Sequence, residues 1–154
     1  MTTFQGSVSE HVDASVDQMF RVITDISRLP QWNRRIHHVV EAPDTLGDGA
    51  EWVVQMRING ARWNSRALLE EVDASAGRFR YVSRTDDDNP SRAHWTWELT
   101  PAGDGSEVTV SWDLRPRTSF RKHIGAPMRN RQLEREVRDS IHAAASAAVE
   151  SRAQ

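Results

Sequence analysis

Seven stretches of the chain alternate apolar and polar residues, which is the pattern of strands that bury one face. The alternation is clearest from Val108 to Leu114, where every second side chain is apolar and the residues between are threonine, serine and aspartate. Asn59-Gly60, between the third and fourth stretches, favours a two-residue hairpin turn. The last six stretches follow one another without a helix between them, which predicts an antiparallel sheet. The predicted strands are Thr3–Val12, Ile36–Val40, Glu51–Ile58, Arg62–Val72, Arg78–Arg84, Ala93–Leu99 and Glu107–Arg115.

Three other segments have helical patterns. Ser15 and Gln18 have the spacing of a capping box, ahead of an apolar stretch that predicts a helix up to Ile23. Ser27–Trp32 predicts a short second helix or bend, because it contains a proline. A long helix is predicted from Pro127 to residue 150, with an apolar stripe at Met128, Leu133, Val137, Ile141, Ala144, Ala145 and Ala148. A sheet with one apolar face needs a cover, and only this helix is long enough, so the pattern predicts an α+β fold.

This order of elements resembles the helix-grip fold of the START/Bet v 1-like (SRPBCC) superfamily. The segment SVDQMFRVITDISRLPQWNRRI resembles the opening helices of its polyketide cyclase/dehydrase-type branch, because an apolar helix is followed by Asp25, by Leu29-Pro30 and by Trp32-Asn33. By element order the resemblance covers nearly the whole chain. It implies a single domain over residues 1–154, in which a curved seven-stranded antiparallel sheet wraps around the C-terminal helix and a ligand lies between them.

The aromatic residues indicate what would line such a ligand site. The chain has six tryptophans and one tyrosine, and five of the tryptophans share the apolar face of their predicted strands. A single strand tryptophan is most often ordinary core. Five indoles under one helix pack less easily than leucine or valine, which favours a cavity with an aromatic wall. The resemblance implies that the ligand lies between the sheet and the C-terminal helix. The ligand-binding residues expected from this position are Trp32, Trp52, Val54, Met56, Trp63, Ser65, Phe79, Tyr81, Trp95, Trp97, Trp112, Leu133, Val137 and Ile141.

Three functions are compatible with this reading. The first is the binding of a small hydrophobic molecule, aromatic or lipid-like. The second is a polyketide aromatase/cyclase or dehydratase, a lyase or isomerase acting on a poly-β-ketone, for which Tyr81 and Ser65 are the candidate catalytic residues. The resemblance implies an inward arginine on a central strand, but Ala67 stands there, and Arg62 and Arg66 are predicted to point outward. The third is a protein-interaction module like the chaperone-ATPase activators of the superfamily.

Composition and charge exclude other classes. The absence of cysteine excludes disulfides, thiolate metal sites and cysteine nucleophiles, and a net charge of −2 argues against a nucleic-acid-binding surface. His37 and His38 are adjacent and so cannot share one metal, and we expect His38 to face inward with Ile36 and Val40. No metal or cofactor is expected.

The chain has no apolar run of membrane-spanning length and no secretory signal, so a cytoplasmic location is expected. Arg115–Arg138 holds eight basic and two acidic side chains. Because no exposed apolar residues accompany these charges, we expect no stable association with membranes. A homodimer is possible.

Overall fold

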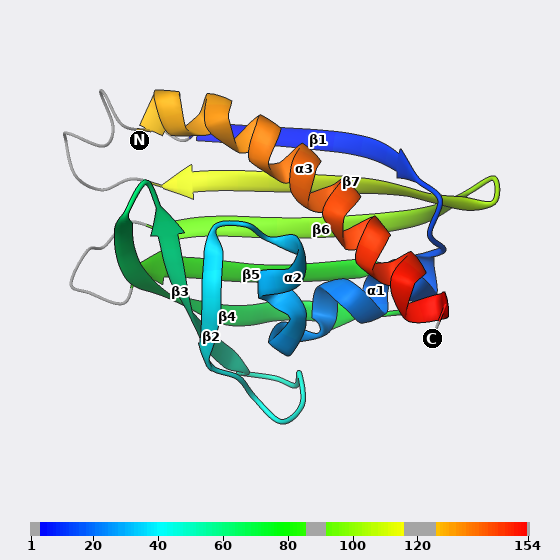
Figure 1. Cartoon of the computed structure of the whole chain (residues 1–154), viewed down its shortest axis with the longest axis horizontal. Coiled ribbons are helices and arrows are strands. Elements are labelled where there is room, and N and C mark those ends of the chain that lie inside the picture. The colour runs from blue at the N-terminus through cyan, green and yellow to red at the C-terminus, as the bar shows by residue number, and fades with distance from the viewer. Residues whose placement is uncertain (1–3, 86–91, 116–125, 154) are drawn as a thin grey trace.

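The structure is a computed structural model, in which residues 4–85, 92–115 and 126–153 are described, with the side chains of the last helix described from 132 to 150. Figure 1 shows a sheet crossed on one face by a long helix. The elements are β1 (Phe4–Val12), α1 (Val16–Thr24), the 3-10 turn η1 (Ile26–Arg28), α2 (Leu29–Trp32), β2 (Ile36–Glu41), β3 (Glu51–Ile58), β4 (Ala61–Asp73), β5 (Arg78–Thr85), β6 (Arg92–Ala102), β7 (Gly105–Arg115) and α3 (Ala126–Ala153). Part of the basic segment 115–138 lies outside the described residues.

The strands form one antiparallel sheet in the order β1-β7-β6-β5-β4-β3-β2. The six strands from β2 to β7 therefore run as a meander, and β1 closes the order by pairing with β7. In Figure 1, α3 runs diagonally over the sheet, with α1 and α2 beside it. Its contacts are with β1, β7, α1 and α2. The predicted helix-grip fold, a seven-stranded sheet gripping the C-terminal helix, is confirmed.

The connection between β1 and β2 is built from local signals. Ser15 accepts a hydrogen bond from the backbone of Gln18, and the Gln18 side chain accepts one from the Ser15 backbone, so the predicted capping box is confirmed. The short second helix is split into η1 and α2, with Pro30 in the first turn of α2, where a missing N–H costs nothing. This tight connection places Trp32 against the inner face of the sheet.

The prediction for β2 is wrong in one respect. Ile36 is buried, but His38 and Val40 are exposed, whereas Val39 packs against the core. The pairing with β3 shifts register between Ile36 and His38 and again between Val39 and Glu41. Each irregularity turns the following side chains to the other face, so His38 faces away from the core and alternation does not apply along this strand.

The inner face of the sheet carries a continuous aromatic row. Trp52 contacts Phe79 and Tyr81 at ring-centroid distances of 6.0 and 5.4 Å. Tyr81 stacks on Trp95 at 6.5 Å, and Trp95 lies 6.2 Å from Trp112. Large rings therefore pack against one another across β3, β5, β6 and β7, and much of the aromatic surface is core.

Candidate ligand-binding site

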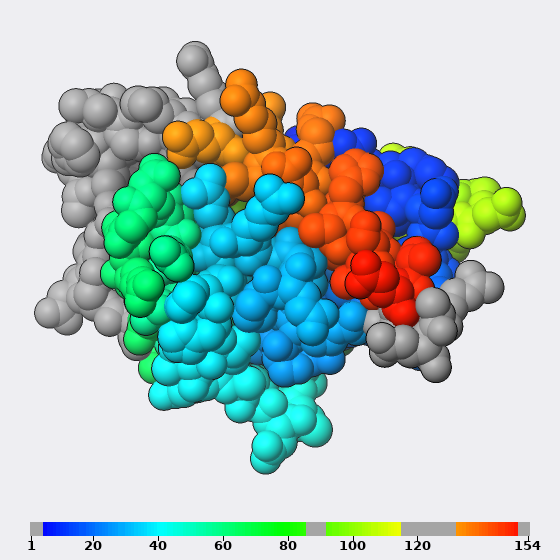
Figure 2. Space-filling view, viewed as in Figure 1, coloured from blue at the N-terminus to red at the C-terminus, as the bar shows by residue number. Residues whose placement is uncertain are grey.

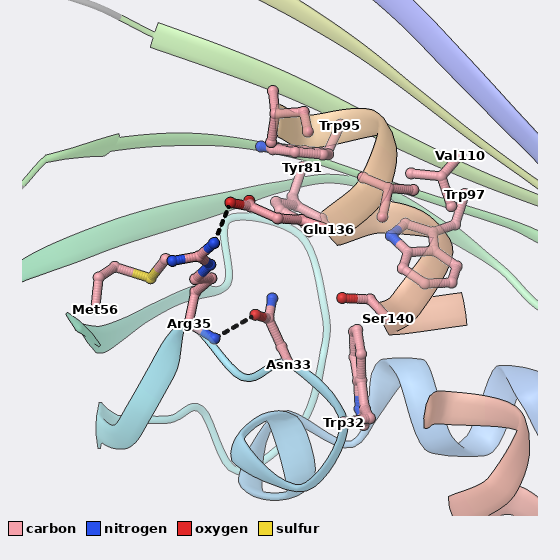
Figure 3. A pocket seen from close by; sticks show the side chains of 12 residues that line it. Trp32, Asn33, Arg35, Met56, Tyr81, Trp95, Trp97, Val110, Glu136 and Ser140 are labelled. Atoms are coloured by element: carbon pink, nitrogen blue, oxygen red, sulfur yellow. Dashed lines mark hydrogen bonds and ion pairs between the residues drawn. The ribbon is translucent and has the colours of Figure 1, made fainter. Parts of the chain in front are cut away.

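A cavity of about 90 Å³ lies between the sheet and α3. Figure 3 shows its lining: side chains of β5, β6 and β7 on one side, α3 on another, and the turn between α2 and β2 on a third. In Figure 2, α3 and the segment from α1 to β2 lie together over the sheet, which leaves the strands behind them largely covered. The lining residues are Trp32, Asn33, Arg35, Met56, Tyr81, Trp95, Trp97, Val110, Leu133, Glu136, Val137 and Ser140.

Four of the twelve lining residues are aromatic. Trp32, from α2, meets Trp97 edge to face with a centroid distance of 5.5 Å. The indole N–H of Trp95 donates to Ser83 Oγ over 3.3 Å, which fixes the orientation of that ring. The indole nitrogen of Trp32 is buried and has no hydrogen-bond partner among the described residues. A buried donor of this kind is uncommon, and it stands here in a side chain that borders the cavity.

Tyr81 supplies a hydroxyl group in this aromatic wall. Burial raises the pKa of Tyr81 to about 12, while the indole of Trp97 acts in the opposite direction and is outweighed. The hydroxyl therefore stays protonated at neutral pH and can donate a hydrogen bond to an oxygen of a bound molecule. The same pKa makes it a poor proton acceptor.

An ion pair spans the cavity on its polar side. Arg35 Nη2 lies 2.8 Å from Glu136 Oε1, so the turn before β2 is tied to α3. The side chain of Glu136 is 15% exposed and that of Arg35 is 35% exposed. The backbone of Arg35 is held independently, because its N–H donates to Asn33 Oδ1 over 3.1 Å and its carbonyl accepts from the N–H of Arg57 over 2.7 Å. Figure 3 shows the guanidinium facing Glu136 across the opening between the turn and the helix.

The predicted site residues separate into two groups. Trp32, Met56, Tyr81, Trp95, Trp97, Leu133 and Val137 line the cavity. Seven others are not part of the lining: five are buried in the core (Trp52, Val54, Phe79, Trp112 and Ile141) and two are half-buried on β4 (Trp63 and Ser65). Ser65, a candidate catalytic residue, is therefore not brought together with Tyr81 at the cavity.

Sequence reasoning missed Asn33, Arg35, Val110, Glu136 and Ser140. The alternation of the last strand already put Val110 on the inner face, and Glu136 and Ser140 lie one helical turn from Leu133 and Val137, so helical spacing could have found them. Arg35 stands in a turn, where no period applies. Arg35 is the cation in the described cavity lining, although it comes from this turn and not from a central strand, whereas Arg66 points outward toward Glu41 and Glu51.

Two findings limit other kinds of site. Among the described residues, no group of three or more histidine, aspartate or glutamate side chains could hold a metal ion. Within the same part of the chain, no helix is long and apolar enough to cross a membrane.

The comparisons with known proteins give a family from the sequence and a fold from solved structures. The sequence matches the family model for polyketide cyclase/dehydrase and lipid transport over residues 2–149. No curated protein sequence matches. The Zhui aromatase/cyclase from Streptomyces sp. R1128 superposes with a TM-score of 0.78 and 13% identity, covering 99% of this chain and 97% of that one.

Two other solved structures show the same fold. The di-domain aromatase/cyclase StfQ of the steffimycin pathway has a TM-score of 0.79 and 12% identity over 99% of this chain and 52% of its own. Ara h 8.0201 has a TM-score of 0.76 and 12% identity over 97% of this chain and 99% of its own. At these identities the likeness establishes the helix-grip architecture, and the family model covers almost the entire sequence. The chain belongs to the polyketide cyclase/dehydrase and lipid-transport family.

Proposed function

We propose that the protein binds a small hydrophobic molecule, aromatic or lipid-like, in the cavity between the sheet and α3. The observation that carries the proposal is the cavity itself, which has an aromatic wall and a few polar groups gathered on one side. This combination is typical of small-molecule sites, where apolar surface supplies the affinity and a few hydrogen-bonding groups fix the orientation. Membership of a family of cyclases, dehydrases and lipid-transport proteins supports it.

The size of the cavity sets a condition on binding. Drug-sized ligands occupy sites of about 300–1,000 Å³, whereas this cavity has about 90 Å³. A ligand with two or more rings therefore requires α3 and the α2–β2 turn to separate. The described tie across this opening is the Arg35–Glu136 pair, and partly exposed ion pairs of this kind typically contribute only about 0–1 kcal/mol. Breaking this pair is therefore a small part of the cost of opening, which also exposes the buried side chains of Leu133 and Val137 on α3.

The test is a titration of tryptophan fluorescence with the methyl ester of pyrenebutyrate, whose pyrene ring takes up indole emission. We expect saturable quenching in the wild type and an affinity about tenfold lower or more in Ser140→Leu, which puts an apolar side chain into the cavity. Ser146→Leu is the matched control, because Ser146 is exposed on the same helix. Absence of quenching by both this ester and the free acid, or equal binding by both variants, would overturn the proposal.

A cyclase or dehydratase function is the second candidate, and the hydroxyl of Tyr81 is the observation that favours it. In an aldol closure, a carboxylate such as Glu136 removes a proton from the carbon beside one carbonyl, while Tyr81 donates to the oxygen on which negative charge develops. The enolate carbon then attacks a second carbonyl, and the resulting alkoxide is protonated. If this function holds, the protein changes the product distribution from a poly-β-ketone relative to spontaneous cyclisation, and Tyr81→Phe abolishes that change.

A further inference from the structure

The Arg35–Glu136 pair joins two parts of the structure that must separate when the cavity opens. Arg35 lies between α2 and β2, and Glu136 lies on α3, and both line the cavity. In the closed state the guanidinium lies 2.8 Å from the carboxylate, and separation of the two elements breaks this contact. A neutral ligand that opens the cavity leaves a partly buried cation without this partner, which is unfavourable.

An anionic ligand avoids this cost, because its own carboxylate can take the place of Glu136. The guanidinium offers five N–H donors in a planar fork that matches a carboxylate. The backbone from which this side chain extends is hydrogen-bonded to Asn33 and Arg57, so its place beside the cavity does not depend on α3. When the helix moves away, the base of the Arg35 side chain therefore stays within reach of a ligand.

The remaining polar groups of the lining also suit an anion better than a cation. Tyr81 and Ser140 bring hydroxyl donors, and Trp32 brings an indole N–H that has no partner among the described residues. The Asn33 side-chain oxygen is already used by the Arg35 backbone. Together with Arg35, these groups offer several donors to an anion, and Glu136 is the one carboxylate among the described residues of the lining.

We propose that Arg35 is a specificity-determining residue that recognises the carboxylate of an amphiphilic acid, and that Glu136 is the internal carboxylate that this ligand displaces. The apolar body of the acid enters between the aromatic wall and α3. The inference deepens the proposed function and rests on it. It makes recognition of the ligand and opening of the cavity one event, since the group that leaves Arg35 also belongs to the helix that must move.

The experiment compares pyrenebutyrate with its methyl ester, which differ in charge at the end of one apolar body. Glu136→Gln keeps the size of the side chain and removes its charge, so neither probe has to break the ion pair and the affinity for both is expected to rise. The rise is expected to be larger for the acid, because the repulsion between Glu136 and the carboxylate of the ligand is removed as well. Arg35→Gln is expected to lower the affinity for the acid about tenfold, because the acid loses its cation, and not to lower the affinity for the ester. Circular dichroism and thermal melts of each variant verify that it is folded.

Arg138→Gln is the matched control. Arg138 lies on the same helix but pairs with Glu10 of β1, 3.3 Å away and apart from the cavity lining, so its loss loosens α3 without touching the acid-binding group. It is expected to leave the ratio of acid to ester affinity unchanged. Equal changes for acid and ester in the Arg35 and Glu136 variants would overturn the assignment and leave hydrophobic binding standing. Failure of every folded variant and the wild type to bind either probe would overturn both.

Discussion

At the residue scale, Tyr81 has a titration that can be measured alone, because the chain has one tyrosine and one lysine. Burial raises the pKa of Tyr81 from 10.0 to about 12. In the unfolded chain the phenol ionises near pH 10, while the folded protein holds the proton, so ionisation favours the unfolded state as the pH rises from 10 toward 12. At pH 11 this removes about 1 kcal/mol of stability.

The measurement is the free energy of unfolding of the wild type and of Tyr81→Phe at pH 9 and pH 11. Between pH 9 and pH 11, the free energy of unfolding of the wild type should fall by about 1 kcal/mol more than that of Tyr81→Phe. Tyrosinate absorbance provides a direct check, with a midpoint near 12 in the folded protein. A midpoint at 10 in the folded state would show that the hydroxyl is solvated and that the cavity is open to bulk water.

What could be predicted of the site also depends on the kind of residue. Alternation put Trp95 and Trp112 on the inner face correctly, because side chains on a strand alternate strictly. It could not tell that Trp95 lines the cavity while Trp112 is core, since that depends on the curvature of the sheet and on where α2 and α3 cross it. Arg35 had no periodic signal at all, and only the three-dimensional path of the turn brings it to Glu136.

At the element scale, the pairing of β1 with β7 depends on a small residue. Gly6 lies opposite Trp112, and a Cβ placed on Gly6 would approach Cε2 of the indole to 2.6 Å. Trp112 is only 2% exposed, so the ring has little room to move aside. Gly6→Ala is therefore expected to cost about 1–3 kcal/mol through overpacking.

Denaturant titrations of Gly6→Ala and Gly47→Ala test this expectation. Gly47 precedes β3 in a loop where a Cβ would meet no atom within 4 Å, so its substitution is expected to be nearly neutral. Both variants should unfold with the slope of the wild type, and only Gly6→Ala should unfold at a lower denaturant concentration. Equal midpoints would mean that β1 and the indole can shift without cost.

The elements themselves were largely predictable, and β2 shows where the method fails. Long alternating stretches such as β7 define their own inner face, and the capping box of Ser15 and Gln18 marks the start of α1. In the short β2, two register irregularities reverse the face within six residues, so His38 and Val40 turn outward. Nothing in a run of mixed apolar and polar residues signals a bulge, because its cause is the pairing with β3.

At the scale of the whole molecule, the tryptophans serve two purposes. The row from Trp52 to Trp112 is continuous packing, whereas Trp32, Trp95 and Trp97 also border the cavity. The number of indoles on the inner face therefore does not by itself predict a cavity, because some of them only pack against one another. Indoles that face one another pack closely on the inner face of the sheet, and the described cavity lies where α2 and α3 approach Trp95 and Trp97.

Two substitutions separate the packed region from the cavity. Ala67 is 4% exposed on β4, opposite Trp52 of β3 and Ser83 of β5, and it does not line the cavity. Ala67→Phe is expected to cost about 1–3 kcal/mol, because a close-packed core cannot take the added ring. Ser140→Leu adds its volume next to existing space, so its cost should be smaller.

Thermal and denaturant unfolding of Ala67→Phe and Ser140→Leu would measure this contrast, and ligand titration of the same samples would relate it to function. The expected pattern is a loss of stability in Ala67→Phe and a loss of binding in Ser140→Leu. The reverse pattern would place the usable space at the β3–β4 end of the sheet, next to Trp52, where the resemblance puts the ligand-facing arginine. Each variant is expected to affect a different property. If both variants instead lost both stability and binding, cavity and core would form one cooperative unit, which the ligand could not enter without unfolding part of the sheet.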